Sequence, residues 1–283
     1  MKKYSYIIIP TLVILFSACA GRMEMFGKAG EAKIEASNPA WELAEKYWES
    51  RIEPAIAYKA LEEYQKAAEI EPNNPALLAE LSHCYYYVAN YIEQDKAKCD
   101  ELFLAGVNIG EQAMALNVNF KDKLDETGSS VESVDELGDD IDGLFWAASN
   151  LGKWAATKNM IVRLKWKKQL EAYWGHIRDI DENYYYAGCY RFWGALPTKV
   201  PFGDLNDAKA QFEKGIELVP NYFGTRVLMA EYYATKAQDR EVYETQLKYV
   251  AGSDEKIIPE VQAENHWEVI NAKKMLEEID DHF

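Results

Sequence analysis

The chain has few of the side chains that catalysis and metal binding usually require. Its 283 residues include four histidines, and no two of these lie at the spacing that places metal ligands on one helix. It has no Gly-x-Ser-x-Gly motif and no glycine-rich loop that could cradle a phosphate. The sequence therefore predicts no catalytic residue, no metal and no cofactor. An enzyme that uses a pair of the 47 acidic residues on a glycan is the weakest alternative.

Positive charge is also scarce. Lys and Arg number 31 against 47 Asp and Glu, so the formal net charge is -16. Nucleic-acid phosphates require a basic face, and anionic lipid head groups attract basic segments. The composition argues against nucleic acid as a partner and leaves membrane contact to a lipid anchor alone. Solubility is a sufficient reason for the excess of acid.

Cysteine occurs four times, at positions 19, 84, 99 and 189. No two cysteines form a C-x-x-C motif, and the three that follow Cys19 leave at least one unpaired. We expect these three to be small buried residues. A disulfide between Cys84 and Cys99, the nearest pair, is the alternative in an exported protein.

Long apolar runs are absent except at the N-terminus. Two lysines precede the apolar residues 7–16, which are too few for an ordinary membrane span. The next residues complete Leu15-Phe16-Ser17-Ala18-Cys19, which resembles the lipobox of bacterial lipoproteins, with Phe16 where leucine is usual. The resemblance implies cleavage before Cys19 and acylation of its sulfur. An ordinary cleaved signal with an incidental cysteine is the alternative.

These features divide the chain into three parts. We predict a lipoprotein signal peptide over residues 1–18, a lipidated Cys19 with a tether over 19–37, and a single helical domain over 38–283. The mature protein is then periplasmic and held at a membrane by Cys19. Ala20 permits sorting to the outer membrane, and the choice between the inner and the outer membrane stays open.

Repeated spacing indicates the fold. The pattern Ala60-x3-Tyr64-x2-Ala67-x4-Pro72 returns as Ala208-x3-Phe212-x2-Gly215-x4-Pro220, and weaker copies begin at Gly106 and Leu170. This is the spacing of the second helix of a tetratricopeptide repeat, in which small residues allow close helix approach and proline ends the helix. We predict an all-α, irregular tetratricopeptide-like array of helical hairpins, that is, an α-solenoid or superhelical bundle. An unrelated helical bundle is the alternative.

Two stretches interrupt this pattern. Residues 121–142 are rich in acids and turn formers, and they predict a loop or a short mobile helix. Residues 195–204 contain two prolines and predict a loop, with Asp204 as the N-cap of the next helix.

Aromatic residues are unusually abundant, with 8 Trp, 19 Tyr and 10 Phe, and many lie between positions 145 and 193. Such a cluster predicts either an aromatic-walled pocket or channel for an apolar ligand, or rings that fill the core between hairpins. The two interpretations stay open. The residues that we expect to line a pocket are Trp146, Trp154, Tyr185, Trp193 and Tyr232.

Residues 140–280 resemble a known family, the T component of tripartite ATP-independent periplasmic (TRAP) transporters. The resemblance rests on the segments Leu-Phe-Trp-Ala-Ala at 144–148, Ala-Leu-Pro at 195–197 followed by Gly203-Asp204, and Ala-Glu-Tyr-Tyr at 230–233. The family often has two glycines before that aspartate, whereas this chain has one. The resemblance implies a helical periplasmic lipoprotein that is not an enzyme and associates with a solute-binding P component. It also implies uptake of apolar or carboxylate-bearing ligands, a pore, and assembly into a homo-oligomer such as a trimer.

We therefore expect an accessory transport lipoprotein that binds the P component and passes a ligand through an aromatic-lined pore. The alternative is a general tetratricopeptide scaffold lipoprotein for envelope protein assembly, which the fold alone would favour. Arg240, between Asp239 and Glu241, is expected to form a structural ion pair, with a carboxylate clamp as the lesser alternative.

Overall fold

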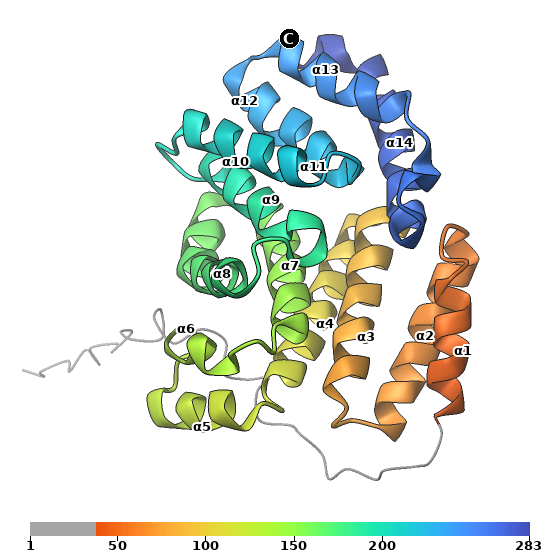
Figure 1. Cartoon of the computed structure of the whole chain (residues 1–283), viewed down its shortest axis with the longest axis vertical. Coiled ribbons are helices and arrows are strands. Elements are labelled where there is room, and N and C mark those ends of the chain that lie inside the picture. Colours follow the sequence, from red (N-terminus) through yellow and green to blue (C-terminus); the bar gives the residue numbers. More distant parts are fainter. Residues whose placement is uncertain (1–37) are drawn as a thin grey trace, which may run out of the picture.

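The computed structural model describes residues 38–283, and every regular element in that range is a helix (Figure 1). The predicted all-α class is therefore confirmed for the described chain. None of the described helices combines the length and the hydropathy that crossing a bilayer requires. The predicted signal peptide 1–18, the predicted lipidation at Cys19 and the tether to residue 37 lie outside the described residues.

The first half of the fold consists of α1 to α7, joined by short turns. Their bounds are α1 Pro39–Trp48, α2 Pro54–Ile70, α3 Pro75–Tyr87, α4 Lys96–Met114, α5 Val118–Thr127, α6 Ser130–Ser133 and α7 Asp142–Ala156. The second half follows as α8 Met160–Ile180, α9 Tyr184–Lys199, α10 Leu205–Leu218, α11 Phe223–Leu228, α12 Thr235–Ala237, α13 Arg240–Ala251 and α14 Gln262–Glu277. Two π-helical turns, Val88–Ile92 and Met229–Ala234, extend α3 and α11.

Local sequence fixes where these helices begin. The side chains of Asn38, Asn74 and Asp204 accept hydrogen bonds from backbone N–H groups of the first turns of α1, α3 and α10, as N-caps do. The predicted cap at Asp204 is thus confirmed. Pro39 and Pro75 occupy the first helical position, where the missing N–H has no partner to lose.

Neighbouring helices pack side by side along much of the chain. The most extensive contacts join α1 to α2, α3 to α4, α4 to α7 and α9 to α10. In the predicted repeats, Ala60, Tyr64 and Ala67 of α2 are buried, as are Ala208 and Phe212 of α10. A bundle would bury these residues equally well, so the tetratricopeptide-like array stays a prediction.

The last helix returns to the first ones (Figure 1). Arg51, after α1, forms a buried ion pair with Glu264 of α14, with 2.8 Å between Nη2 and Oε2. The indole Nε1 of Trp267 donates a hydrogen bond to the Tyr87 hydroxyl at 3.1 Å. Because a buried carboxylate without its cation is strongly destabilising, this pair secures α14 against the N-terminal helices.

The predicted loop over residues 195–204 is wrong for its first half. Helix α9 continues through Pro197 to Lys199, and irregular backbone begins only at Val200. Pro197 lies in the last turn of α9, where it removes one hydrogen bond close to the helix end and so costs less than in mid-helix. The backbone at Gly203 lies close against Pro197. A Cβ at Gly203 would be only 2.0 Å from the Pro197 carbonyl oxygen.

The acidic stretch 121–142 contains short helices rather than an open loop. It holds most of α5, all of α6 and the 3-10 turn Val134–Leu137. Gly128 and Gly138 end two of these elements with positive φ angles of 66° and 57°, which glycine adopts without strain.

The three described cysteines are free thiols, so the alternative disulfide between Cys84 and Cys99 does not occur in this structure. Cys84 and Cys189 are buried, as expected, and Cys99 is half-buried. Burial raises the pKa of the Cys189 thiol to about 11, which leaves it protonated at neutral pH.

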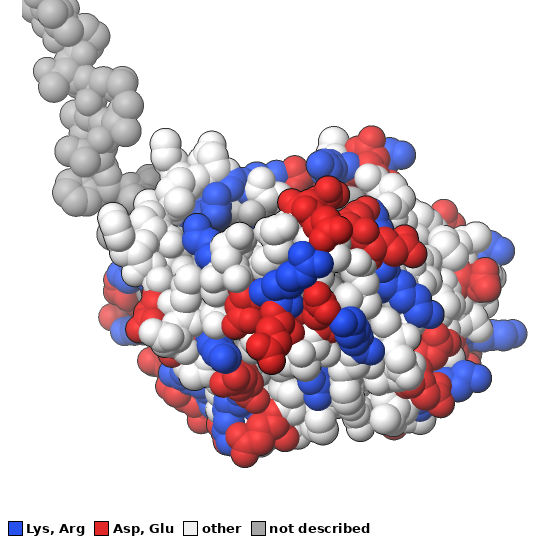
Figure 2. Space-filling model, turned by 90° about the horizontal axis from the view of Figure 1, so that it is seen from above, with Lys and Arg blue, Asp and Glu red and all other residues white. Residues whose placement is uncertain are grey.

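Charged side chains of both signs mix on the surface seen from above the fold (Figure 2). Arg240 is exposed, and its guanidinium pairs with Glu244 at 3.1 Å and Asp280 at 2.9 Å. The expected structural ion pair at Arg240 is therefore confirmed, although its partners are not the flanking acids.

Candidate functional site

A largely apolar cavity opens between α7, α8, α9 and the π-helical turn after α11. Its volume is about 930 Å³, including the open space at its mouth. Rings and aliphatic side chains from these four elements, joined by Tyr86 of α3, Leu228 of α11 and Tyr222 just before α11, form most of its wall; the others are Phe145, Trp146, Leu170, Trp174, Tyr185, Phe192, Leu196 and Tyr232. A cavity with such walls favours an apolar chain over water.

Three of the five predicted lining residues, Trp146, Tyr185 and Tyr232, lie in this wall. Trp154 and Trp193 are not among the lining residues. Trp154 packs edge-on against Trp166, with 6.4 Å between ring centroids. Trp193 lies under the guanidinium of Arg178, 5.0 Å from the ring centroid.

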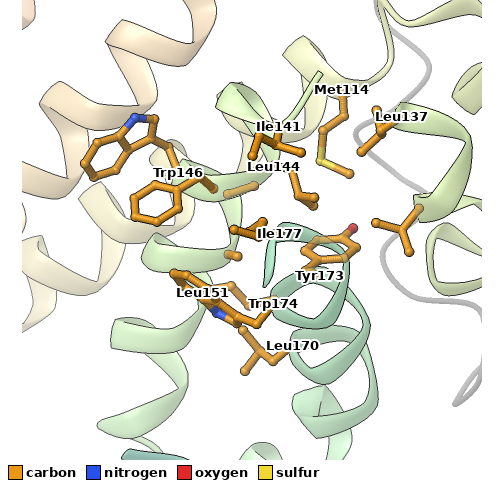
Figure 3. Packing of buried hydrophobic residues seen from close by; sticks show 14 of the residues in the cluster. Met114, Leu137, Ile141, Leu144, Trp146, Leu151, Leu170, Tyr173, Trp174 and Ile177 are labelled. Atoms are coloured by element: carbon orange, nitrogen blue, oxygen red, sulfur yellow. The ribbon is translucent and has the colours of Figure 1, made fainter. Parts of the chain in front are cut away.

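Trp146 belongs both to the cavity wall and to the core. It projects from α7 away from the aliphatic cluster around Leu144 and toward the N-terminal helices (Figure 3). There it stacks on His83 of α3, with 3.6 Å between centroids and 9° between ring planes, and it meets Tyr185 edge-on at 4.7 Å. Trp146 is thus both a cavity-lining residue and a core residue.

A second, polar cavity lies on the other side of Trp146 and Tyr185. Its volume is about 730 Å³ with its open space, and its wall includes Arg51, Glu80 and His83. Trp146 and Tyr185 line both cavities, so the two cavities adjoin at these residues. The Tyr185 hydroxyl and His83 Nε2 lie at hydrogen-bond distance, 3.2 Å, on the polar side.

Tyr185 is carried by a strained turn at the start of α9. Tyr185, Tyr186 and Ala187 have φ angles of 42°, 57° and 56°, in the left-handed region. Each such residue costs roughly 1–2 kcal/mol unless it is glycine. Arg191 holds the turn in place, since its Nη1 and Nη2 donate to the Tyr186 and Tyr185 carbonyl oxygens at 2.8 and 2.9 Å.

Five cations, and no acidic residue, belong to the described lining of the apolar cavity. They are Lys153, Arg163, Lys167, Arg191 and Lys199. Burial lowers the pKa of Lys199, whose ammonium lies 3.6 Å from the centroid of the Tyr232 ring. Burial also raises the pKa of the Tyr232 phenol to about 12, so this hydroxyl stays neutral. Sequence reasoning missed these cations, because three separate helices bring them together.

The described residues contain no group of His, Cys, Asp or Glu that could hold a metal ion. The arrangement can instead enclose an apolar chain and place cations beside it. Fold and cavity together define a class of helical proteins with an internal amphiphilic chamber.

Comparison of the sequence with models of known protein families identifies the family of this chain. The sequence model of the TRAP transporter T-component matches residues 59–283, and the chain belongs to this family. The resemblance of residues 140–280 to this family is thus confirmed. No curated protein matches the chain. Membership gives the chain an accessory role in TRAP transport, association with other TRAP components and a periplasmic setting, in a family that is not one of enzymes.

Proposed function

We propose that the chain is a lipoprotein, anchored through Cys19, that holds the solute-binding P component and receives an apolar or carboxylate-bearing ligand from it. The apolar cavity carries this proposal, because a protein that only holds a partner has no need of an internal chamber. The tetratricopeptide-like hairpin array and a homo-oligomer, such as a trimer, belong to the same proposal.

The proposed route of the ligand runs from the apolar cavity toward the polar one. Opening it requires the Trp146 and Tyr185 rings to part. The left-handed turn that carries Tyr185 supports such a movement, because backbone strain is relieved when the turn rearranges.

An exposed apolar patch beside the cavity mouth supports docking of the P component there. We call it the mouth patch, and it consists of Met160, Ile161, Leu164 and Phe202. Ile161 and Leu164 flank the lining residue Arg163, and Phe202 follows the lining residue Val200 by two positions. Ile161 is 80% exposed and Phe202 is fully exposed. Exposed large apolar side chains near a cavity are typical of interfaces.

Replacing Ile161 and Phe202 together by aspartate tests this surface. Asp is favourable in the first turn of α8 and is tolerated at the left-handed φ of Phe202, so the I161D/F202D variant should fold normally. Calorimetric titration of the soluble chain, residues 20–283, with a TRAP solute-binding P component should show a Kd raised about tenfold or more.

Val118→Asp is the matched control, because Val118 is 70% exposed, stands at the first position of α5 and does not line the cavity. It should leave the Kd unchanged. A wild-type chain that fails to bind the P component but retains proteins of envelope assembly would favour the scaffold alternative instead.

A further inference from the structure

The lining of the apolar cavity has the opposite charge balance from the whole protein. The chain carries 47 acids against 31 bases, and both signs mix on its surface (Figure 2). The described lining nevertheless combines five cations with no Asp or Glu. Solubility does not explain positive charge gathered around an apolar chamber in an acidic protein.

Two of these cations already have protein partners. Lys167 pairs with Glu171 on the same helix. Arg191 donates to the two carbonyl oxygens of the left-handed turn and lies 4.3 Å from the centroid of the Tyr222 ring. Lys167 and Arg191 therefore stabilise the folded structure.

The other three, Lys153, Arg163 and Lys199, have no ion-pair partner within the described chain. Arg163 Nη1 donates to the Lys199 carbonyl oxygen at 3.0 Å, which joins the start of α8 to the end of α9. The Nε of Arg163 is buried and has no hydrogen-bond partner among the described residues. A buried guanidinium N–H without an acceptor is costly, and an anionic ligand would supply that acceptor.

The charges of Arg163 and Lys153 also act on Lys199. Burial is the first cause that lowers the pKa of Lys199; Glu231 raises it, and Arg163 and Lys153 add repulsion that lowers it again. Glu231 acts on Lys199 and Glu268 acts on Lys153, but neither acid lines the cavity, whose wall holds the three half-buried cations from α7, α8 and α9. An anion between them would relieve this repulsion.

We infer that Lys153, Arg163 and Lys199 bind the anionic head group of a single-chain amphiphile whose apolar chain occupies the aromatic cavity. The inference rests on the proposed function and makes its ligand specific. Charge-assisted hydrogen bonds hold the head group at the mouth, while the chain extends among Leu170, Phe192 and Leu196. A neutral or cationic amphiphile leaves the three cations unpaired and therefore binds less tightly.

Calorimetric titration of the soluble chain, residues 20–283, with dodecanoate below its micelle concentration tests the inference. This chain keeps every residue that the structure describes. We expect saturable binding of dodecanoate and at least tenfold weaker binding of dodecyltrimethylammonium, which has the same chain length and the opposite charge. Equal binding of the two amphiphiles, or no binding of dodecanoate, overturns the inference.

Single variants locate the head group. Lys153→Gln and Lys199→Gln should each weaken dodecanoate binding about tenfold, which is the usual effect of losing one charge-assisted hydrogen bond. Lys168→Gln is the control, because Lys168 is exposed on α8 and does not line the cavity. An equal loss in Lys168→Gln contradicts the assignment. Unchanged melting temperatures show that the variants fold.

The same preparations separate this inference from the proposed function. If the P component binds and dodecanoate does not, the ligand class is wrong and the accessory role stands. If dodecanoate binds in the expected pattern and the P component does not, the amphiphile site stands and the proposed partner is wrong.

Discussion

Glu268 of α14 is a buried carboxyl group whose protonation should couple folding to pH. Its Oε1 accepts a hydrogen bond from the Tyr91 hydroxyl at 2.9 Å. Burial raises the pKa of Glu268, while the charge of Lys153 and the hydrogen bond from Tyr91 act in the opposite direction. Because its pKa is higher in the folded state, the folded chain binds this proton more tightly, and stability is lost as pH rises above the ordinary carboxyl value of 4.5.

Glu268→Gln removes this titration and keeps an oxygen for Tyr91. We expect the variant to unfold at higher urea concentration than the wild type at pH 7, with the difference shrinking toward pH 4.5. Glu277→Gln, an exposed change on the same helix, should leave the profile unchanged. Identical pH profiles for wild type and Glu268→Gln would show that Glu268 does not titrate with a raised pKa.

The site residues differ in how well sequence predicts them. Clustered rings in residues 145–193 predict an aromatic pocket or core, and Trp146 and Tyr185 are among the residues that line the cavity. Helical spacing shows that a ring is buried but not which neighbour it faces, so Trp154 and Trp193 could not be separated from them. Lys153 and Lys199 carry no local signal at all, since only the packing of α7 against α8 and α9 gives them a role.

At the scale of the helices, the crossing of α4 and α7 depends on glycine, which has no side chain to keep the two backbones apart. A Cβ at Gly110 would lie 2.8 Å from the backbone nitrogen of Ala147 and 2.8 Å from the carbonyl oxygen of Gly143. Backbone atoms cannot move aside as a flexible side chain can. The close contact of α7 with α4 in turn fixes the position of Trp146.

Gly110→Ala should therefore destabilise the fold by about 1–3 kcal/mol, the usual cost of overpacking. Gly175→Ala is the matched change, because a Cβ there has no neighbour within 4 Å in the interior of α8. It should stabilise the fold by about 0.5–1 kcal/mol, because alanine loses less backbone entropy than glycine. Thermal unfolding of both variants measures the difference, and shifts of the same sign would contradict the described crossing.

Sequence predicted the helices better than their ends. Asp204 follows a standard cap pattern and was predicted correctly. The end of α9 was missed because Pro197 normally indicates a break, whereas its place in the last turn and its contact with Gly203 are tertiary features. The left-handed turn at Tyr185–Ala187 has no sequence signature, since these residues do not favour positive φ.

At the scale of the whole molecule, the fold brings distant chain segments together at two places, the polar cavity and the mouth patch. The return of α14 to the N-terminal helices, through Arg51 and Glu264, closes the polar cavity. The meeting of α8 with the end of α9, through Arg163 and Lys199, places the mouth patch beside the apolar cavity. Family membership indicates that the partner is another TRAP component. We expect that partner to dock at the mouth patch.

Hydrogen–deuterium exchange of the soluble chain, with and without a TRAP solute-binding P component, tests most directly the proposed docking at the mouth patch. Binding at the cavity mouth should slow amide exchange in residues 160–167 and 199–203, while residues 118–127 of α5 exchange as in the free chain. Protection confined to α5 or to the N-terminal helices α1 and α2, or no change anywhere at saturating P component, would contradict the account.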